Sequence, residues 1–197
     1  MILLFSILII EIYSKSDKCQ EGPLIISSST TEIEEGEFEL CSEFTGSLII
    51  PNKVKTIGMS AFRGCSGFTG SLLIPDSVKY IGPNAFSDCT GFTGTLTISS
   101  KITVIENSTF SGCSNFSGLL QIPKQVTRIN EYAFFRCSGF TGELHLPEEL
   151  TYLGQYAFSY CTKLNGSLKI PQKVTSIGGY CFSFCTGFNG DLTIPPT

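Results

Sequence analysis

The chain has 197 residues, with 13 Lys and Arg against 17 Asp and Glu, and a formal net charge of −4. This balance, with its basic residues scattered and not gathered in a stripe, excludes a nucleic-acid-binding protein of the usual basic kind. His145 is the single histidine, and the sequence contains no phosphate-cradling loop, paired-carboxylate motif or metal-ligand cluster. The sequence therefore predicts no catalytic residue, no metal site and no cofactor.

The chain begins with the apolar run MILLFSILII, which only Ser6 interrupts. The run is too short to span a bilayer as a helix, which needs about 20 residues. Small residues at Ser14 and Ser16 offer cleavage points, so we interpret residues 1–16 as a secretory signal peptide. No Lys or Arg precedes the run, and an uncleaved anchor or an ordinary buried strand stay open as alternatives. A cleaved product would have no transmembrane span.

Residues 17–40 fit the register of the following sequence only weakly. Their apolar positions fall where those of the first clear repeat fall, at Leu24, Ile26, Ile33 and Phe38. The segment is also acidic, with seven Glu and no Lys or Arg in residues 21–43. A polar terminal repeat keeps the open end of a stack soluble, so we interpret residues 17–40 as a degenerate N-terminal capping repeat.

Seven cysteines then follow one another at a constant interval of 24 residues: Cys41, Cys65, Cys89, Cys113, Cys137, Cys161 and Cys185. A constant period of this length is the signature of stacked structural repeats. Residues 41–197 therefore predict six full repeats and a half repeat, in one elongated domain. Such repeats are stable only together, because each one buries its apolar faces against its two neighbours.

Within the first unit, residues 47–50 alternate inward and outward side chains and predict a strand, which Pro51 ends. Residues 54–57 predict a second short strand, and the following SAFRGC predicts one helical turn with Phe62 inside. Glycine recurs at the position of Gly46 in all seven units, which indicates a tight turn or a positive φ. Stacked copies should place like residues about 4.8 Å apart.

The recurring string IPxxVxxIGxxAFxxCxxF resembles the BspA-like leucine-rich repeat, a class found in surface proteins of anaerobic bacteria and parasitic protists. The resemblance covers about residues 41–197. It implies a leucine-rich-repeat solenoid of the α/β class, a curved right-handed stack of short parallel β-strands with single helical turns. It also implies display outside the cell and adhesion to host matrix or to other cells.

The third repeat departs from the pattern, with Ser99 for Pro, Glu106 for Gly and Thr109 for Ala. Glu106 would tolerate a positive φ poorly, so we expect a local irregularity there. Asn130 occupies the same column one repeat later, and asparagine accepts that conformation more readily.

Nine cysteines in a secreted chain suggest disulfides. The constant register instead favours a column of buried free thiols, because parallel side chains bridge poorly. If a bridge exists, Cys19 is the expected partner, with Cys41 as its nearest candidate. Cys181 lies four residues before Cys185, a spacing that we interpret as core packing and not as a metal site.

Two surfaces are candidates for binding a partner. The first is the outward-facing strand column: Ile49, Leu73, Thr97, Gln121, His145 and Lys169. The second is aromatic and shares one face of the predicted helical turns: Tyr132, Tyr156, Tyr160, Tyr180 and Phe184. An alternative is that these rings cover the convex side of the core. Three sequons, at Asn107, Asn115 and Asn165, would accept glycans in a eukaryotic secretory route.

The favoured hypothesis is a non-enzymatic, secreted or cell-surface adhesion protein that binds a protein or glycan partner, such as host matrix or a cell surface, through its repeat sheet. The alternative is an intracellular protein–protein interaction scaffold. The half repeat at the end leaves apolar side chains uncovered, which predicts self-association through this C-terminal repeat.

Overall fold

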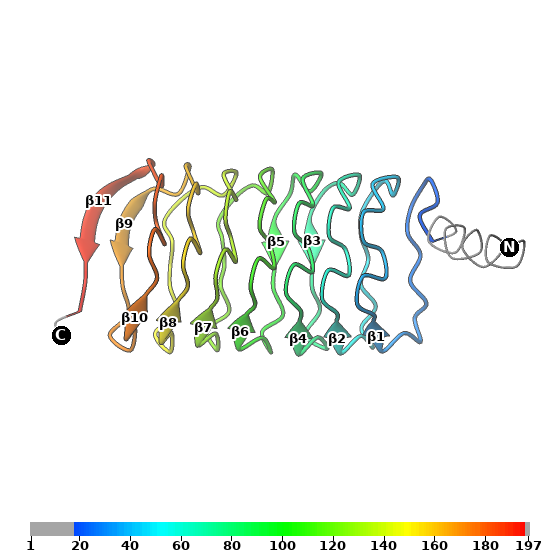
Figure 1. Ribbon diagram of the computed structural model, residues 1–197, viewed down its shortest axis with the longest axis horizontal. Helices are drawn as coiled ribbons and strands as arrows, with labels where there is room; N and C mark the ends of the chain where they lie inside the picture. Colours follow the sequence, from blue (N-terminus) through cyan, green and yellow to red (C-terminus); the bar gives the residue numbers. More distant parts are fainter. Residues whose placement is uncertain (1–17, 196–197) are drawn as a thin grey trace, which may run out of the picture.

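The computed structural model describes residues 18–195, which form a rod of stacked turns (Figure 1). The predicted signal peptide lies outside the described residues. The strands are β1 Glu32–Ile33, β2 Thr56–Ile57, β3 Leu72–Leu73, β4 Tyr80–Ile81, β5 Leu96–Thr97, β6 Val104–Ile105, β7 Arg128–Ile129, β8 Tyr152–Leu153, β9 Gly166–Lys169, β10 Ser176–Ile177 and β11 Phe188–Thr193.

All paired strands are parallel, and they keep the period of the sequence except at the start of β11, where Phe188 pairs with Gly166 before the register shifts. Glu32 pairs with Thr56, and Leu72 pairs with Leu96, so each residue lies beside its equivalent in the next repeat. The strands β1, β2, β4, β6, β7, β8 and β10 follow one edge of the rod in Figure 1, and β3, β5, β9 and β11 lie on another side. The predicted parallel repeat solenoid is confirmed.

The predicted helical turn is wrong, because the third side of each repeat is a run of overlapping turns and no helix occurs in residues 18–195. The N–H of Ala61 donates to Gly58, three residues back, but the N–H of Phe62 donates to Ala85 in the next repeat at 2.8 Å. Every second backbone N–H therefore donates to the neighbouring repeat, and too few N–H groups remain for the continuous hydrogen bonds of a helix. Two left-handed residues, such as Ser60 and Gly64, make this alternation sterically feasible.

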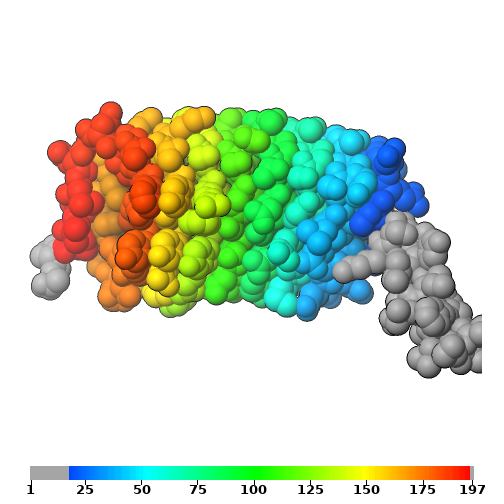
Figure 2. All heavy atoms as spheres, turned by 45° about the horizontal axis from the view of Figure 1, so that its top comes forward, coloured from blue at the N-terminus to red at the C-terminus, as the bar shows by residue number. Residues whose placement is uncertain are grey.

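The core consists of the repeated apolar columns. Leu48, Ile50, Val54, Ile57 and Phe62 are all buried, as predicted from their alternation. Like rings stack on one another along the rod: the centroids of successive phenylalanines in the Phe62 column lie 5.3 to 5.7 Å apart. Figure 2 shows the repeats as successive bands in close contact.

The predicted column of buried thiols is confirmed, and each thiol has a hydrogen-bonding role. Cys89 donates its S–H to the carbonyl oxygen of Phe62 at 3.0 Å, and the same carbonyl accepts the backbone N–H of Cys65 at 3.1 Å. This bond recurs in every repeat from Cys65 to Cys185, always to the Phe carbonyl 27 residues earlier. The thiols therefore fill the second acceptor site of a buried carbonyl.

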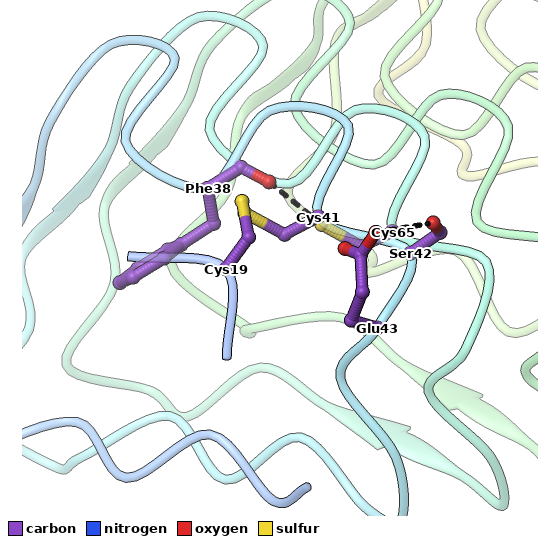
Figure 3. Close-up of a disulfide and its surroundings, with 6 residues drawn as sticks. All are labelled: Cys19, Phe38, Cys41, Ser42, Glu43 and Cys65. Carbon is purple, nitrogen blue, oxygen red and sulfur yellow. Dashed lines mark hydrogen bonds between the residues drawn. A yellow bond between two sulfur atoms is a disulfide. The ribbon is translucent and has the colours of Figure 1, made fainter. Parts of the chain in front are cut away.

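Cys41 begins this column and forms a disulfide with Cys19, with the two Cα atoms 4.9 Å apart (Figure 3). The bridge holds the first described residues against the repeat that follows. On the other side of Cys41, the thiol of Cys65 donates to the carbonyl of Phe38. The cross-link thus meets the thiol column at its N-terminal end.

Glycine recurs in two columns, those of Gly46 and Gly58, for different structural reasons. Gly46, Gly70, Gly118, Gly142 and Gly166 have positive φ, as predicted, although Gly94 and Gly190 do not. The Gly58 column does not have positive φ, so the conformational reason expected at Glu106 is wrong. A Cβ added at Gly82 would lie 2.5 Å from the backbone nitrogen of Met59, so close backbone contact requires glycine there.

The expected irregularity in the third repeat is present. The strands β4 and β6 are not paired, so this ladder divides into β1-β2-β4 and β6-β7-β8-β10. Two departures coincide with the gap: Glu106 carries a Cβ where the backbones otherwise touch, and the Ser99 hydroxyl donates to the carbonyl of Val78 at 2.6 Å. Asn130 also carries a Cβ but keeps its pairing, so we attribute the gap to both departures together.

Candidate binding surfaces

The first candidate surface is the outward strand column, here called the sheet ladder: Ile49, Leu73, Thr97, Gln121, His145 and Lys169. Backbone pairing joins successive members from Ile49 to His145, and Lys169 pairs with Thr193. All six side chains are exposed, as predicted, with exposed fractions of 72% at Ile49 and 58% at Leu73. The rod therefore presents one solvent-facing side chain of this column per repeat.

The chemistry of the sheet ladder changes along the rod. Ile49 and Leu73 form an apolar end, Thr97 and Gln121 are neutral, and His145 and Lys169 form a polar end. The Nζ of Lys169 lies 3.2 Å from a carboxylate oxygen of Glu148. Both of these groups are largely exposed, so the pair adds little stability and is open to exchange with a partner.

The second candidate surface lies on the turns of the last three repeats, where the chain has two left-handed columns. From Ser60 to Gly112 these columns carry small or turn-forming residues: Ser60, Asn84 and Ser108 in one, and Gly64, Asp88 and Gly112 in the other. The capping repeat is an exception, because Leu40 has a φ of 62° in the second column. In the C-terminal repeats the same positions carry bulky residues with φ between 56° and 63°: Tyr132, Tyr156 and Tyr180, then Arg136, Tyr160 and Phe184.

A bulky side chain with positive φ is a backbone outlier. The left-handed conformation costs about 1–2 kcal/mol for each such residue. Ring stacking offsets part of this cost, at about 0.5–1.5 kcal/mol for each aromatic pair. The C-terminal repeats therefore keep rings at positions where Ser, Asn, Asp and Gly form the same turn more easily.

These side chains and Phe135 make one aromatic cluster: Tyr132, Phe135, Arg136, Tyr156, Tyr160, Tyr180 and Phe184. The ring of Tyr156 lies between those of Tyr132 and Tyr180, with centroid distances of 5.0 and 5.1 Å. The Phe135 ring makes edge contacts with three of the tyrosines. The guanidinium carbon of Arg136 lies 5.1 Å from the Phe135 centroid.

Five members of the aromatic cluster are exposed, and Phe135 and Tyr156 are half-buried. The alternative that the rings cover the convex side of the core stays open. The exposed fractions are 37% for Tyr132, 36% for Tyr160, 64% for Tyr180 and 58% for Phe184. The predicted rings share a face, although by consecutive turns and not by a helix. Sequence reasoning missed Phe135 and Arg136. Arg136 could have been found, because it lies in the same sequence column as Tyr160 and Phe184.

A polar group beside the aromatic cluster was also missed. The hydroxyl of Tyr152 donates to a carboxylate oxygen of Glu131 at 2.5 Å, and the Arg128 guanidinium lies 4.1 Å from the Tyr152 ring centroid. The hydrogen bond from Tyr152 lowers the pKa of Glu131, and Arg128 lowers it further. The same hydrogen bond raises the pKa of Tyr152. Glu131 is therefore ionised and already engaged.

The buried thiols have low chemical reactivity. Burial raises the pKa of Cys65 and of Cys181 to about 12, and that of Cys113 further still. Since the thiolate is the reactive form, thiols with raised pKa values are poor nucleophiles and poor metal ligands. No group of His, Cys, Asp and Glu within residues 18–195 is arranged to hold a metal ion.

The three sequon asparagines are exposed. The side-chain amide of Asn115 donates to the carbonyl of Thr90 at 2.8 Å. Asn107 lies on a turn after β6, and Asn165 directly precedes β9. Within the described range, no helix has the length and apolar character needed to cross a membrane.

Solved structures with the same architecture come from bacteria. A leucine-rich repeat protein from Bacteroides ovatus shares 25% identity with a TM-score of 0.60, over 85% of this chain and 54% of its own. A leucine-rich cell surface protein from Faecalibacterium prausnitzii shares 28% with a TM-score of 0.55, over 82% and 47%. The T. pallidum leucine-rich repeat protein shares 22% with a TM-score of 0.69, over 87% and 79%, which supports the fold alone.

The chain thus spans about half the length of the Bacteroides ovatus protein. Among proteins with curated descriptions, none matches it. Its parallel strands, constant register and inward apolar columns define a leucine-rich repeat protein. The sequence profile of the BspA type leucine rich repeat region matches residues 31–120 and 118–196 in six copies. The chain belongs to the BspA type leucine-rich repeat family.

Proposed function

We propose that this chain is a non-enzymatic recognition protein of the cell surface or the secreted fraction, which binds a protein or glycan partner through the sheet ladder. The observation that carries the proposal is the ladder itself, with one exposed side chain per repeat and a graded chemistry from Ile49 to Lys169. A rigid row of differing side chains is suited to recognising an extended surface. Membership of a leucine-rich repeat family supports binding over catalysis.

Two observations support a location outside the cytosol. One structural relative is described as a leucine-rich cell surface protein. The disulfide between Cys19 and Cys41 is typical of oxidising compartments. Residues 1–16 would then be a signal peptide, residues 17–40 a capping repeat closed by the disulfide, and Asn107, Asn115 and Asn165 glycan acceptors in a eukaryotic host.

An intracellular interaction scaffold is the second candidate, because seven cysteines are free: Cys65, Cys89, Cys113, Cys137, Cys161, Cys181 and Cys185. Mass spectrometry of the mature protein separates the two readings. An N-terminus after Ser14 or Ser16, with two thiols protected from alkylation, is expected for the secreted protein. An intact leader with nine alkylated thiols would support the scaffold.

The binding function is tested with the purified chain against immobilised collagen, fibronectin, laminin and an array of defined glycans. Surface plasmon resonance should detect saturable binding to at least one of these. The double variant Ile49→Ser, Leu73→Ser and the single variant Lys169→Glu should weaken it, because they alter exposed side chains without touching the core. Equal binding by all variants would exclude the sheet ladder as the surface.

Self-association is a further part of this proposal. The last two described repeats expose side chains of columns that are buried elsewhere, including Ile177, Leu192 and Ile194. The outer edge of β11 also has unpaired backbone groups, which favour edge pairing. Light scattering of the 197-residue chain should show dimers or larger species, and an added polar repeat should restore the monomer. A monomer across the accessible concentration range refutes this part.

A further inference from the structure

We infer that the aromatic cluster is a second binding surface, and that its partner is a protein presenting a carboxylate flanked by apolar side chains. The inference rests on the proposed binding function but assigns it a different face of the rod. It begins from the two left-handed columns, where the turn-forming residues of the three preceding repeats, from Ser60 to Gly112, give way to Tyr132, Arg136, Tyr156 and Tyr160. Strained positions that cluster on one surface point to a function.

The composition of the cluster fits a protein interface. Tyrosine and arginine are the residues most enriched where protein partners bind tightly, and acidic and lysine residues are depleted there. The cluster holds four tyrosines, two phenylalanines and one arginine. No phenol hydroxyl of these tyrosines has a hydrogen-bond partner within residues 18–195, so the row offers unused donors to a partner.

The stacking of the rings disfavours a glycan as the partner at this surface. Both faces of the Tyr156 ring are covered, by Tyr132 on one side and Tyr180 on the other. One face of the Tyr160 ring is covered by Phe184, at 4.4 Å between centroids. A sugar ring needs a free aromatic face, whereas side chains of a protein can pack against the ring edges and bond the hydroxyls.

The carboxylate requirement comes from Arg136. Arg63, in the first repeat, has an acidic partner in Glu39 at 2.9 Å, but Arg136 has no ion pair in the described part of the chain. Its guanidinium lies near the rings of Phe135 and Tyr160, at 5.1 and 5.7 Å from their centroids. The nearby carboxylate of Glu131 is held by Tyr152. A planar guanidinium on an apolar surface binds a carboxylate with two parallel hydrogen bonds.

The test is selection of random peptides displayed on phage against the full 197-residue chain. The chain itself supplies a matched counter-selection variant, Tyr132→Ser, Arg136→Gly, Tyr156→Asn, Tyr160→Gly, whose new residues occupy the same columns in the N-terminal repeats. Because these residues suit the left-handed turns, the melting temperature of the variant should not fall. A purely structural role of the rings would lower it.

We expect enriched peptides to carry Asp or Glu beside apolar residues. Their affinity should fall by roughly tenfold or more in the four-site variant and in Arg136→Gln, with Arg136→Lys intermediate. The sheet variant Ile49→Ser, Leu73→Ser should bind them like the wild type. If binding is lost only in the sheet variant, the inference fails and the proposed function stands. If neither face of the chain binds any peptide, matrix protein or glycan, both fail.

Three other outcomes overturn the inference. These are enriched peptides without acidic residues, unchanged binding by Arg136→Gln, and binding of glycans or lipid vesicles that depends on the same four side chains.

Discussion

Raising the pH above 9 should unfold this protein steeply, because at that pH its buried thiols stay protonated only in the folded state. Seven thiols have pKa values raised first of all by burial: Cys65, Cys89, Cys113, Cys137, Cys161, Cys181 and Cys185. In the unfolded chain each would titrate at its ordinary value of 9.0. Above that pH the folded state therefore binds more protons than the unfolded state, and stability falls as pH rises.

The size of the effect follows from the number of thiols. Each one contributes about 1.4 kcal/mol of lost stability per pH unit once the unfolded thiol is ionised. Between pH 9 and the pKa of about 11 at Cys185, the seven together contribute about 10 kcal/mol per pH unit. This is comparable with the whole stability of a typical domain, at about 5–15 kcal/mol. We therefore expect unfolding about one to two pH units above 9, while the stabilising contribution is fully present below 9.

The assay is urea unfolding of the wild type and of the double variant Cys113→Ala, Cys137→Ala at several pH values from 8 upward, in oxygen-free buffer. The variant should be less stable at pH 8, because it loses two thiol donors and leaves two small cavities. Above about pH 9.5 its deficit should shrink by about 2.7 kcal/mol per pH unit, since two titrating groups are gone. Lysines and tyrosines titrate in both proteins and cancel. Parallel stability curves would refute the reasoning.

Three more outcomes are expected. Gly82→Ala should destabilise the chain by about 2 kcal/mol or more, because the new Cβ would meet the Met59 backbone. Gly179→Ala, where no atom lies within 4 Å of the added Cβ, should change stability by less than about 0.5 kcal/mol, and urea midpoints compare the two. The double variant Ser99→Pro, Glu106→Gly should restore pairing between β4 and β6, seen as slower hydrogen exchange at Thr103 and at residue 106, with either single change less effective. Reducing the Cys19–Cys41 disulfide should destabilise the N-terminal repeats by about 2–4 kcal/mol, and Cys19→Ser should abolish the response to reductant in a thermal melt.

The repeat period made the solenoid predictable, because one register fixes every inward column at once. Leu48, Val54 and Phe62 are buried as their alternation indicated, and the thiol of Cys89 faces inward with its neighbours. The absence of a helical turn was not predictable from SAFRGC alone. A local pattern cannot show that the amide of Phe62 donates to Ala85, in the next repeat, and not along its own turn.

The same limit applies to the glycines and to the aromatic cluster. The recurrence of Gly58 showed that glycine was needed, but only the packed backbones distinguish close contact from positive φ. The sequence showed that Tyr132 and Tyr160 belong to repeated columns. It did not show how far their rings are exposed to solvent. Phe135 contacts three tyrosines that lie in other columns. The repeat period aligns residues within one column only, so these contacts could be seen only in the folded structure.

The interrupted pairing between β4 and β6 has a mechanical consequence. The turns on the third side remain bonded across this point, since the N–H of Phe86 donates to the carbonyl of Thr109 at 2.9 Å. One side of the rod is therefore continuously bonded while another is interrupted, so we expect the rod to bend more easily at this point than elsewhere. Bending there would change the angle between the disulfide-closed half and the half that carries the aromatic cluster.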